Sequence, residues 1–330
     1  MTIRLARRAT LAGLAASAVT MRARAQPLDP LSVRLDFSPW GVQAAMHLAN
    51  AKGWFAEAHL AVDVQDGRGS GNTLQLVNAG QVDVGQIQIG LIGQARGTGA
   101  TVRSFAGWCR RTDLAVMVDQ DSPLTKVADF RGHSIVVFAA SPWAPFIDLW
   151  LKRGGLDRAS VNLMIVDPAA LWGTYSTRRA EALMSTPPSA LPVVNPTRKS
   201  RAILAEDAGI HYPSYGLVAT EAVLATKAAA LRRLVAVQQR AWEHLRAGGA
   251  RDGAQAMIAA RPDAKLDAAV LEEQITLSLD FFDTPATRGK PIGWQADSDW
   301  QAALRSLEEA GAVKPGWKTN DYFSNDFITA

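Results

Sequence analysis

The run DFSPWGVQAAMHLANAKGWF at residues 36–55 predicts a strand, a loop and a helix in direct succession. Apolar residues alternate with other residues up to Phe37, as in a strand with one buried face. Pro39 excludes a helix at the residue before it and opens a loop that holds Trp40 and Gly41. Small apolar residues then recur at helical spacing until a glycine ends the pattern. In an open α/β sheet, ligands bind at such strand-to-helix junctions.

The same succession of strands and helices continues along the chain and predicts an α/β fold on largely parallel sheets. Strands are expected near residues 60–64, 82–85, 101–108, 113–118, 134–138, 161–166, 184–186 and 202–205. An aromatic and apolar run follows at residues 210–219, and helices dominate from residue 221 onward. A helix is also expected from Gln86 to Ala95. After the apolar strand 134–138, a second loop-to-helix junction carries Ser141 and Trp143 and mirrors the first one.

Residues 1–25 are expected to be an export signal that is cleaved after Ala25. The segment starts with several arginines, continues with a short run of small and apolar residues, and ends on a small-x-small cleavage pattern. The pair Arg7 and Arg8 resembles a twin-arginine signal, although Thr10 stands where an aromatic residue is usual. An ordinary secretory signal is the alternative. Either route predicts a soluble, unanchored protein in the periplasm.

The charge of the chain changes once this segment is set aside. The formal net charge is +4 and the pI is about 9.3. Five of the 35 basic residues and none of the 31 acidic residues lie in residues 1–25, which leaves 30 basic residues against 31 acidic ones. A net charge near −1 does not predict a nucleic-acid partner.

Cysteine and histidine usage argues against a metal or a cofactor. Cys109 is the single cysteine, so it forms neither an intrachain disulfide nor a thiolate cluster, and it lies far from the cleavage site. The five histidines are scattered without a metal-binding motif. We expect no metal, no cofactor and a monomeric chain.

A second candidate for ligand binding is the loop GRGSGN at residues 67–72, which precedes an apolar helix. It lacks both the dinucleotide-binding fingerprint and the lysine of a phosphate-binding loop. A helix N-terminus with free N–H groups binds carboxylate, sulfonate or phosphate, and Ser70 and Asn72 can add side-chain donors. Plain N-capping is an equally weighted alternative.

Several short motifs, in this order and spacing, resemble ABC-transporter solute-binding proteins of the alkanesulfonate, taurine and thiamine-pyrimidine-precursor branch. They are FSPW at 37–40 with His47, AKGWF at 51–55, LAVDV at 60–64, NAGQVDVG at 78–85, DFRGH at 129–133 and DYF at 321–323. The likeness covers most of residues 33–325. It implies a type 2 periplasmic-binding-protein fold, in which two α/β lobes enclose a ligand cleft and close about a hinge.

The resemblance also implies the division of the chain. Residues 26–110 would form the first part of lobe 1, residues 111–213 lobe 2, and residues 214–330 the second part of lobe 1 with the C-terminal helices. The protein would deliver a small molecule to the permease and ATPase subunits of an importer in the inner membrane.

The ligand contacts expected from these junctions and from the resemblance are Trp40, Gly41, His47, Ser70, Asn72, Gln88, Trp108, Ser141, Trp143, Thr186 and Tyr215. Several tryptophans among them favour an aromatic or heteroaromatic ligand, which can also carry an anionic group. Core packing is the alternative for each tryptophan. Trp54, Trp150 and Trp242 stand on helix faces and are assigned to the core.

An exported enzyme is the main alternative function, and the protein is expected not to be one. In yeast-type pyrimidine synthases of the same fold a histidine is consumed as substrate, and only His47 stands near the expected site. The chain lacks the G-x-S-x-G elbow of a serine hydrolase. A ligand sensor that works with a membrane receptor is a further alternative that the sequence does not separate from transport.

Overall fold

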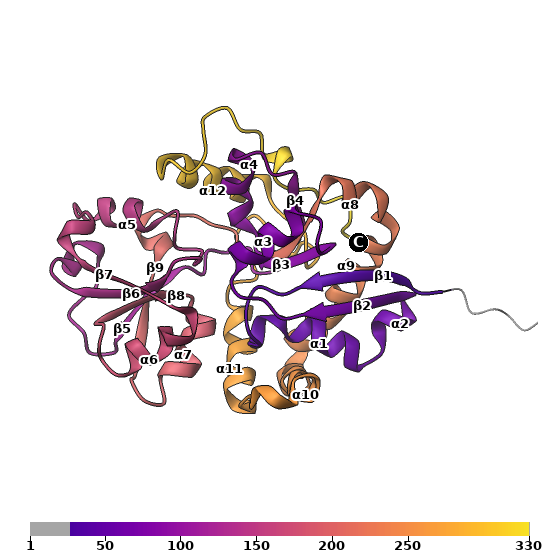
Figure 1. The fold of residues 1–330 in the computed structure, drawn as a ribbon, viewed down its shortest axis with the longest axis horizontal. Coiled ribbons are helices and arrows are strands. Elements are labelled where there is room, and N and C mark those ends of the chain that lie inside the picture. The colour runs from indigo at the N-terminus through magenta and orange to yellow at the C-terminus, as the bar shows by residue number, and fades with distance from the viewer. Residues whose placement is uncertain (1–26, 330) are drawn as a thin grey trace, which may run out of the picture.

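The computed structural model describes residues 27–329, which form two five-stranded sheets with helices packed around them (Figure 1). The expected export signal, residues 1–25, lies outside the described residues. We call the part that carries the first sheet lobe 1 and the part that carries the second sheet lobe 2.

The first sheet has the strand order β2-β1-β3-β10-β4. Its strands are β1 (Asp29–Arg34), β2 (Leu60–Gln65), β3 (Val84–Gln88), β4 (Val102–Gly107) and β10 (Tyr215–Thr220). β1 runs parallel to β2 and β3, whereas β10 is antiparallel to both β3 and β4. A largely parallel sheet was expected, and β10 is the strand of this sheet that departs from that expectation. β10 runs the other way because the chain returns from lobe 2 and enters the sheet at the edge where β3 ends.

The second sheet repeats this arrangement, with the strand order β7-β6-β8-β5-β9. Its strands are β5 (Ala115–Asp119), β6 (Ser134–Phe138), β7 (Asn162–Val166), β8 (Ala182–Ser185) and β9 (Ser200–Leu204). β6 is parallel to β7 and β8, and β5 is antiparallel to β8 and β9. Each sheet thus contains one strand that runs against its neighbours.

Most helices fall where the apolar spacing predicts them. Lobe 1 contains α1 (Ala44–Ala51), α2 (Trp54–Glu57), α3 (Ser70–Asn78), α4 (Ile92–Gly97), α8 (Glu221–Thr226), α9 (Ala228–His244), α10 (Ala250–Ala260), α11 (Ala268–Leu279) and α12 (Asp297–Glu309). Lobe 2 contains α5 (Ile147–Arg153), α6 (Leu171–Ser176) and α7 (Pro187–Val194). The helix expected from Gln86 is wrong at its start. β3 continues to Gln88 because these residues pair with β10, and α4 begins only at Ile92.

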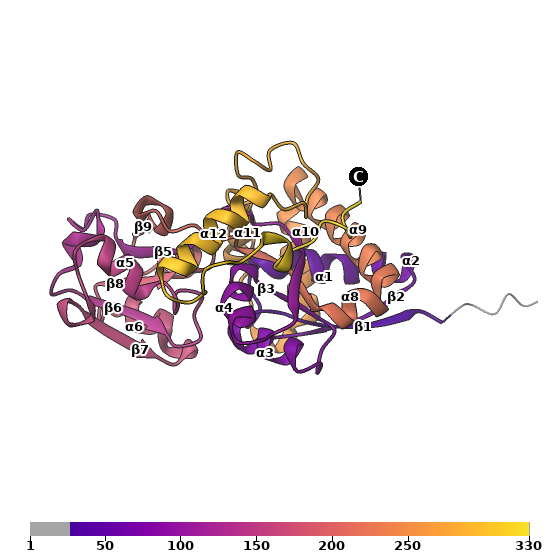
Figure 2. The same cartoon turned by 90° about the horizontal axis from the view of Figure 1, so that it is seen from above.

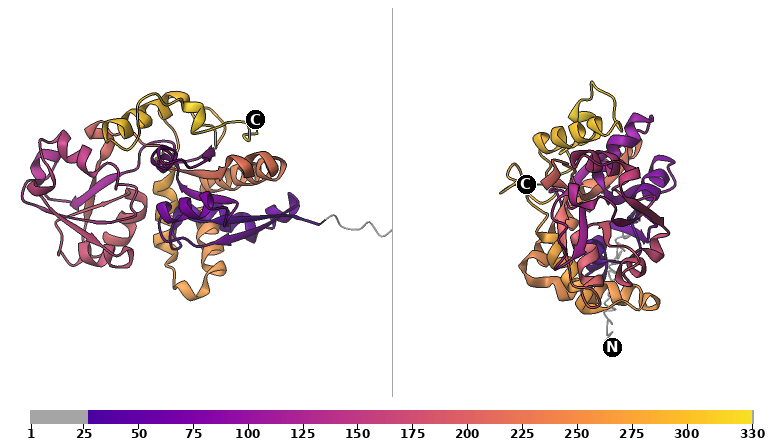
Figure 3. Two further views of the ribbon diagram at one scale, coloured as in Figure 1. Left: turned by 45° about the horizontal axis from the view of Figure 1, so that its top comes forward. Right: turned by 90° about the vertical axis from the view of Figure 1, so that its left-hand side faces the viewer.

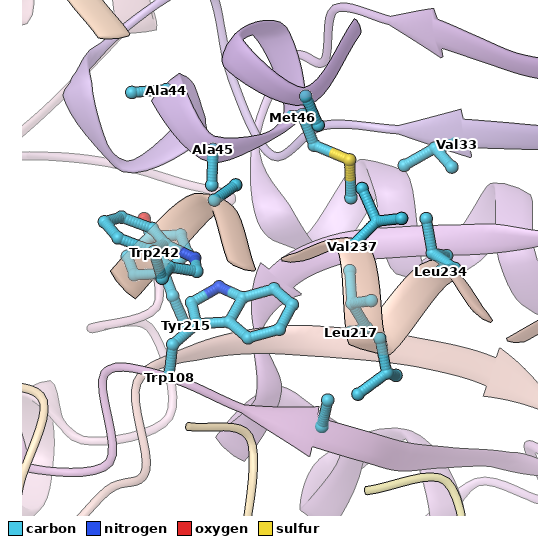
Figure 4. Packing of buried hydrophobic residues seen from close by; sticks show 14 of the residues in the cluster. Val33, Ala44, Ala45, Met46, Trp108, Tyr215, Leu217, Leu234, Val237 and Trp242 are labelled. Atoms are coloured by element: carbon cyan, nitrogen blue, oxygen red, sulfur yellow. The ribbon is translucent and has the colours of Figure 1, made fainter. Parts of the chain in front are cut away.

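Apolar side chains of β1 and β10 pack against α1 and α9 to form a core of lobe 1. Figure 4 shows Met46, Val237 and Leu217 gathered between these helices and the sheet. On the opposite face, apolar residues of α3, α4 and α12 form a second cluster that continues into lobe 2. The three tryptophans assigned to the core from the sequence, Trp54, Trp150 and Trp242, are all buried, which confirms that prediction.

Two segments join the lobes, residues 108–114 and 205–214, and they run side by side. The N–H of Ser214 donates to the carbonyl of Cys109 at 2.9 Å, and the N–H of Tyr212 donates to the hydroxyl of Thr112 at 2.8 Å. We propose on this basis that the lobe boundaries lie near residues 110 and 213. None of the helices between residues 27 and 329 combines the length and the apolar character that a bilayer crossing requires.

Helix α11 lies between the two sheets and packs against α10 of lobe 1 and α7 of lobe 2 (Figures 1 and 3). Helix α12 also reaches lobe 2 (Figure 2), where Glu309 at its end forms an ion pair with Arg153 of α5. Besides the connecting segments, the lobes are therefore in contact at two places, through α11 and α7 and through the ends of α12 and α5.

The backbone after Pro39 approaches α11 so closely that only glycine fits there. A Cβ atom on Gly41 would lie 2.5 Å from Cβ of Gln274 and 2.7 Å from the backbone nitrogen of Ile275. Gly41→Ala should therefore push α11 outward and lower the free energy of unfolding by about 1–3 kcal/mol, as measured by urea denaturation.

The matched control is Gly173→Ala in α6, where a Cβ atom meets nothing within 4 Å. This change should leave stability unchanged or raise it slightly, because alanine favours a helix over glycine. Equal effects of the two substitutions would contradict the close approach at Gly41.

Candidate ligand-binding site

A cavity of about 140 Å³ lies between the lobes, where the loops that follow strands of both sheets meet. Its wall in lobe 1 includes Asp36, Trp40, Ser70, Gln88, Tyr215 and Gln274, and its wall in lobe 2 includes Phe138, Ser141, Trp143, Trp172, Thr186 and Ser189. Residues that are up to 238 positions apart in the chain thus share one small space. Concave sites with mainly apolar walls and a few polar groups bind small molecules.

Aromatic rings from both lobes give the cavity its apolar character. The ring centroids of Trp40 and Tyr215 lie 5.3 Å apart, at an interplanar angle of 71°. Phe37 of lobe 1 and Phe138 of lobe 2 approach to 6.0 Å between centroids. In lobe 2 the indole N–H of Trp143 donates to the carbonyl of Ser185 at 3.1 Å, which fixes the orientation of this ring.

Asp36 is the one residue of the cavity wall with a carboxyl group, and it is 3% exposed. Its Oδ2 accepts hydrogen bonds from the Trp40 indole at 3.1 Å and the Tyr215 hydroxyl at 3.0 Å. Its Oδ1 accepts from the Gln43 amide at 2.9 Å. Burial raises the pKa of Asp36 above its ordinary value, although these hydrogen bonds act in the opposite direction.

Gln274 of α11 connects the two walls. Its Oε1 accepts a hydrogen bond from the N–H of Gly41 at 2.9 Å, and its Nε2 donates to the carbonyl of Ser189 in α7 at 3.3 Å. A single side chain therefore holds the loop after β1 and the helix of lobe 2 that borders the cavity.

Gln88 ties the cavity to the segments that join the lobes. Its Nε2 donates to Oδ1 of Asp113 at 3.3 Å, and its N–H donates to the hydroxyl of Ser70 at 3.2 Å. Burial raises the pKa of Asp113 to about 7, so this carboxyl group titrates near neutral pH.

The cavity brings together most of the contacts expected from the sequence. Those on its wall are Trp40, Ser70, Gln88, Ser141, Trp143, Thr186 and Tyr215. Their contact with a ligand stays a prediction. Gln88 ends β3 and Tyr215 begins the antiparallel strand β10, whereas the others lie in segments that follow strands.

The other expected contacts lie outside the cavity wall. Gly41 faces α11. Asn72 follows Ser70 by two positions on α3, which turns its side chain by about 200° toward another face of the helix. Trp108 is fully buried and packs in the lobe 1 core near Tyr215 and Trp242 (Figure 4).

His47 also lies away from the cavity wall. It is 2% exposed and belongs to α1, which packs against α10. Burial, and secondarily the charge of Arg261, lowers its pKa to about 4, while Asp66 acts in the opposite direction. The imidazole is therefore neutral at pH 7 and serves as a packed side chain.

Asp36, Phe138, Trp172 and Gln274 also line the cavity, although the sequence did not predict them as site residues. A usable signal existed for Asp36, because it is a charged residue at the end of an apolar strand, directly before the loop with Trp40. No local signal pointed to Gln274, since the helix that carries it follows more than 200 residues after the loop it contacts. Within residues 27–329, no three His, Cys, Asp or Glu side chains are grouped as metal ligands.

The buried carboxyl group of Asp113 predicts a specific pH dependence of stability. Its pKa in the folded protein, about 7, exceeds its ordinary value of 3.8, so the folded state binds the proton more tightly than the unfolded state. The contribution of Asp113 to stability is therefore largest at low pH and declines as the pH rises through 7. Asp113→Asn should remove this decline, so that the variant gains stability relative to wild type between pH 5 and pH 8.

Urea denaturation at both pH values measures this difference. Asp263→Asn, which changes an exposed aspartate of lobe 1, is the matched control and should keep the wild-type profile. The same stability difference between Asp113→Asn and wild type at pH 5 and pH 8 would count against a raised pKa at Asp113.

Solved structures of similar fold cover almost the whole chain. The aliphatic sulphonate binding protein SsuA from Escherichia coli is 16% identical with a TM-score of 0.64, over 89% of this chain and 91% of that one. The nitrate-binding protein NrtA from Synechocystis PCC 6803 is 14% identical with a TM-score of 0.65, over 91% and 87% of the two chains.

The CA3427 gene product of Candida albicans, described as exhibiting the generic periplasmic binding protein fold, is 14% identical with a TM-score of 0.65, over 90% of this chain and 97% of that one. At these identities the similarity concerns the fold alone. It confirms the expected α/β fold of type 2 periplasmic binding proteins.

Sequence comparison gives two further results. No curated protein matches the chain. The model of the NMT1/THI5-like family matches residues 41–248, which is more than half of the 330 residues, and the protein therefore belongs to the NMT1/THI5-like family.

Proposed function

We propose that the protein is the substrate-binding component of an ABC importer and that it captures a small aromatic solute between its lobes. The observation that carries this proposal is the cavity itself, whose wall combines aromatic rings and hydrogen-bonding groups from both lobes. The protein would act in the periplasm after cleavage of the export signal behind Ala25, and it would deliver its ligand to permease and ATPase subunits.

The volume of the cavity supports a ligand with one ring. An apolar cavity of about 150 Å³ in another protein holds benzene. The cavity here has a similar volume, about 140 Å³, and carries polar groups at Ser70, Gln88 and Thr186. These groups can orient a heteroatom or a polar substituent of the ligand, whereas a fused ring system would require the lobes to separate.

The contacts between the lobes support capture by closure. The hydrogen bond from Gln274 to Ser189 and the approach of Phe37 to Phe138 both join the lobes beside the cavity. Opening of these contacts would widen the way into the cavity, and the two adjacent connecting segments provide the place for a hinge. Rotation of two lobes about such a hinge is the usual way in which periplasmic binding proteins enclose a ligand.

Binding is favoured over the enzyme alternative by the position of His47. That alternative requires a base beside Trp40, and His47 was the one histidine available there from the sequence. His47 is buried outside the cavity wall instead, and the described residues of that wall include neither histidine nor cysteine.

A stability screen tests the proposal. The chain from Gln26 onward should gain thermal stability from one class of compound in a panel of single-ring aromatic acids, amines, pyrimidines and small sulfonates. A ligand that binds only the folded state adds about 2.7 kcal/mol of stability at a hundredfold excess over its dissociation constant. The compound should be recovered unchanged. Conversion of the compound, or no stabilisation by any class, would contradict the proposal.

Trp172→Ala should weaken binding of the stabilising compound about tenfold by removing a partly exposed ring from the cavity wall, as measured by calorimetry. Trp317→Ala is the matched control, because Trp317 is also partly exposed but lies outside the cavity wall and bonds to Glu308. Equal losses of affinity in the two variants would place the binding site elsewhere.

A further inference from the structure

The cavity carries a negative group without a positive counterpart. Among the residues that line it in the described part of the chain, Asp36 has a carboxyl group and none is a lysine, arginine or histidine. The ion pairs found in residues 27–329 do not include Asp36. A buried carboxylate of this kind is costly unless a positive charge accompanies it.

The hydrogen bonds of Asp36 orient the carboxylate but supply no charge. All three donors, the Trp40 indole, the Gln43 amide and the Tyr215 hydroxyl, are neutral. A carboxylate offers about four acceptor positions. Two are filled on Oδ2 and one on Oδ1, so Oδ1 keeps a free position for a further donor in a group that borders the cavity.

We propose that the ligand carries a protonated nitrogen, which donates a hydrogen bond to Asp36 and supplies the missing positive charge. This inference rests on the proposed function and names the charge class of its ligand. Trp40 and Tyr215 reach the carboxylate through the indole N–H and the phenol hydroxyl, so they fix the direction in which the carboxylate can accept the ligand's N–H group.

The N-terminus of α3 is the competing feature, because it would favour an anion. α3 begins at Ser70 in the cavity wall, and no side chain caps it. A helix N-terminus corresponds to about half an elementary charge. The ionised carboxylate of Asp36 carries a full charge, so the balance in the cavity is negative whenever Asp36 is ionised.

Three probes of nearly equal size test the inference: benzylamine, benzyl alcohol and benzoate, which are cationic, neutral and anionic at pH 8. Calorimetry on the wild-type chain from Gln26 should show benzylamine binding about tenfold or more tightly than benzyl alcohol, as expected for a hydrogen bond to a charged group. Benzoate should bind most weakly. In Asp36→Asn the affinities for the amine and the alcohol should come within about threefold of each other.

The amide of Asp36→Asn can be accommodated in the folded protein. Oε1 of Gln43 has no hydrogen-bond partner, and rotation of the Gln43 amide lets it accept from the new NH₂ group while Trp40 and Tyr215 keep their acceptor. The rotation gives up the longer hydrogen bonds from Gln43 to the carbonyls of Phe37 and Ser38. A second measurement needs no variant. The affinity of the wild type for benzylamine should rise with pH across the titration of Asp36, because the amine stays protonated while this carboxyl group ionises.

The outcomes separate this inference from the proposed function. Tighter binding of benzoate than of benzylamine by the wild type, or an unchanged preference for the amine in Asp36→Asn, overturns the inference and leaves a binding protein with a different ligand. An affinity for benzylamine that stays flat or falls with pH across the titration of Asp36 overturns it as well. Any compound that stabilises the protein in the thermal-stability screen described under the proposed function serves as a fourth probe. If neither the three probes nor the panel bind, the proposed function fails together with this inference.

Discussion

The buried carboxylate of Asp36 is the interaction on which the cavity depends. It stands at the end of β1 and collects donors from the following loop through Trp40, from the next turn through Gln43, and from β10 through Tyr215. A polar group in this position holds its neighbours in fixed directions, because each donor would be left unsatisfied if it moved away. Burial raises the pKa of Asp36. The group that orders the cavity wall is therefore also the group whose protonation depends on whether a charged ligand is bound beside it.

The topology explains how distant residues reach this carboxylate. The chain leaves lobe 1 after β4, builds the second sheet, and returns as the antiparallel strand β10 between β3 and β4. Tyr215 is the first residue of that strand and therefore lies at the edge of the sheet that faces lobe 2. α11 then places Gln274 between Gly41 and Ser189, which adds a hydrogen-bonded link to lobe 2. The antiparallel insertion and α11 together complete a site that begins at residue 36.

Local sequence patterns predicted the elements of the fold better than the composition of the site. Alternating apolar residues located β1 and β2, and the run around Val136 located a central strand of lobe 2. The junction loops pointed to Trp40 and Trp143, which both lie on the cavity wall, and their contact with a ligand stays a prediction. These successes share one cause, namely that a strand, a turn and a helix are each determined by a few neighbouring residues.

The errors have the opposite cause. The direction of β10 and the contact of Gln274 depend on long-range packing, which no local spacing records. His47 and Trp108 lie close in sequence to residues of the cavity wall, yet both are buried outside it, and Trp108 packs in the lobe 1 core. Asn72 lies outside the cavity wall that contains Ser70 because two residues along a helix point to different faces.

The central claim is that an uncompensated carboxylate in the cavity meets a positive charge on the ligand. The most direct measurement is the titration of the Asp36 side-chain carboxyl by ¹³C NMR, in the free protein and in the presence of saturating benzylamine, with Asp36→Asn used to assign the signal. The account predicts a raised pKa for Asp36 in the free protein and a lower pKa once the cation is bound. A pKa that stays the same or rises on binding would contradict it.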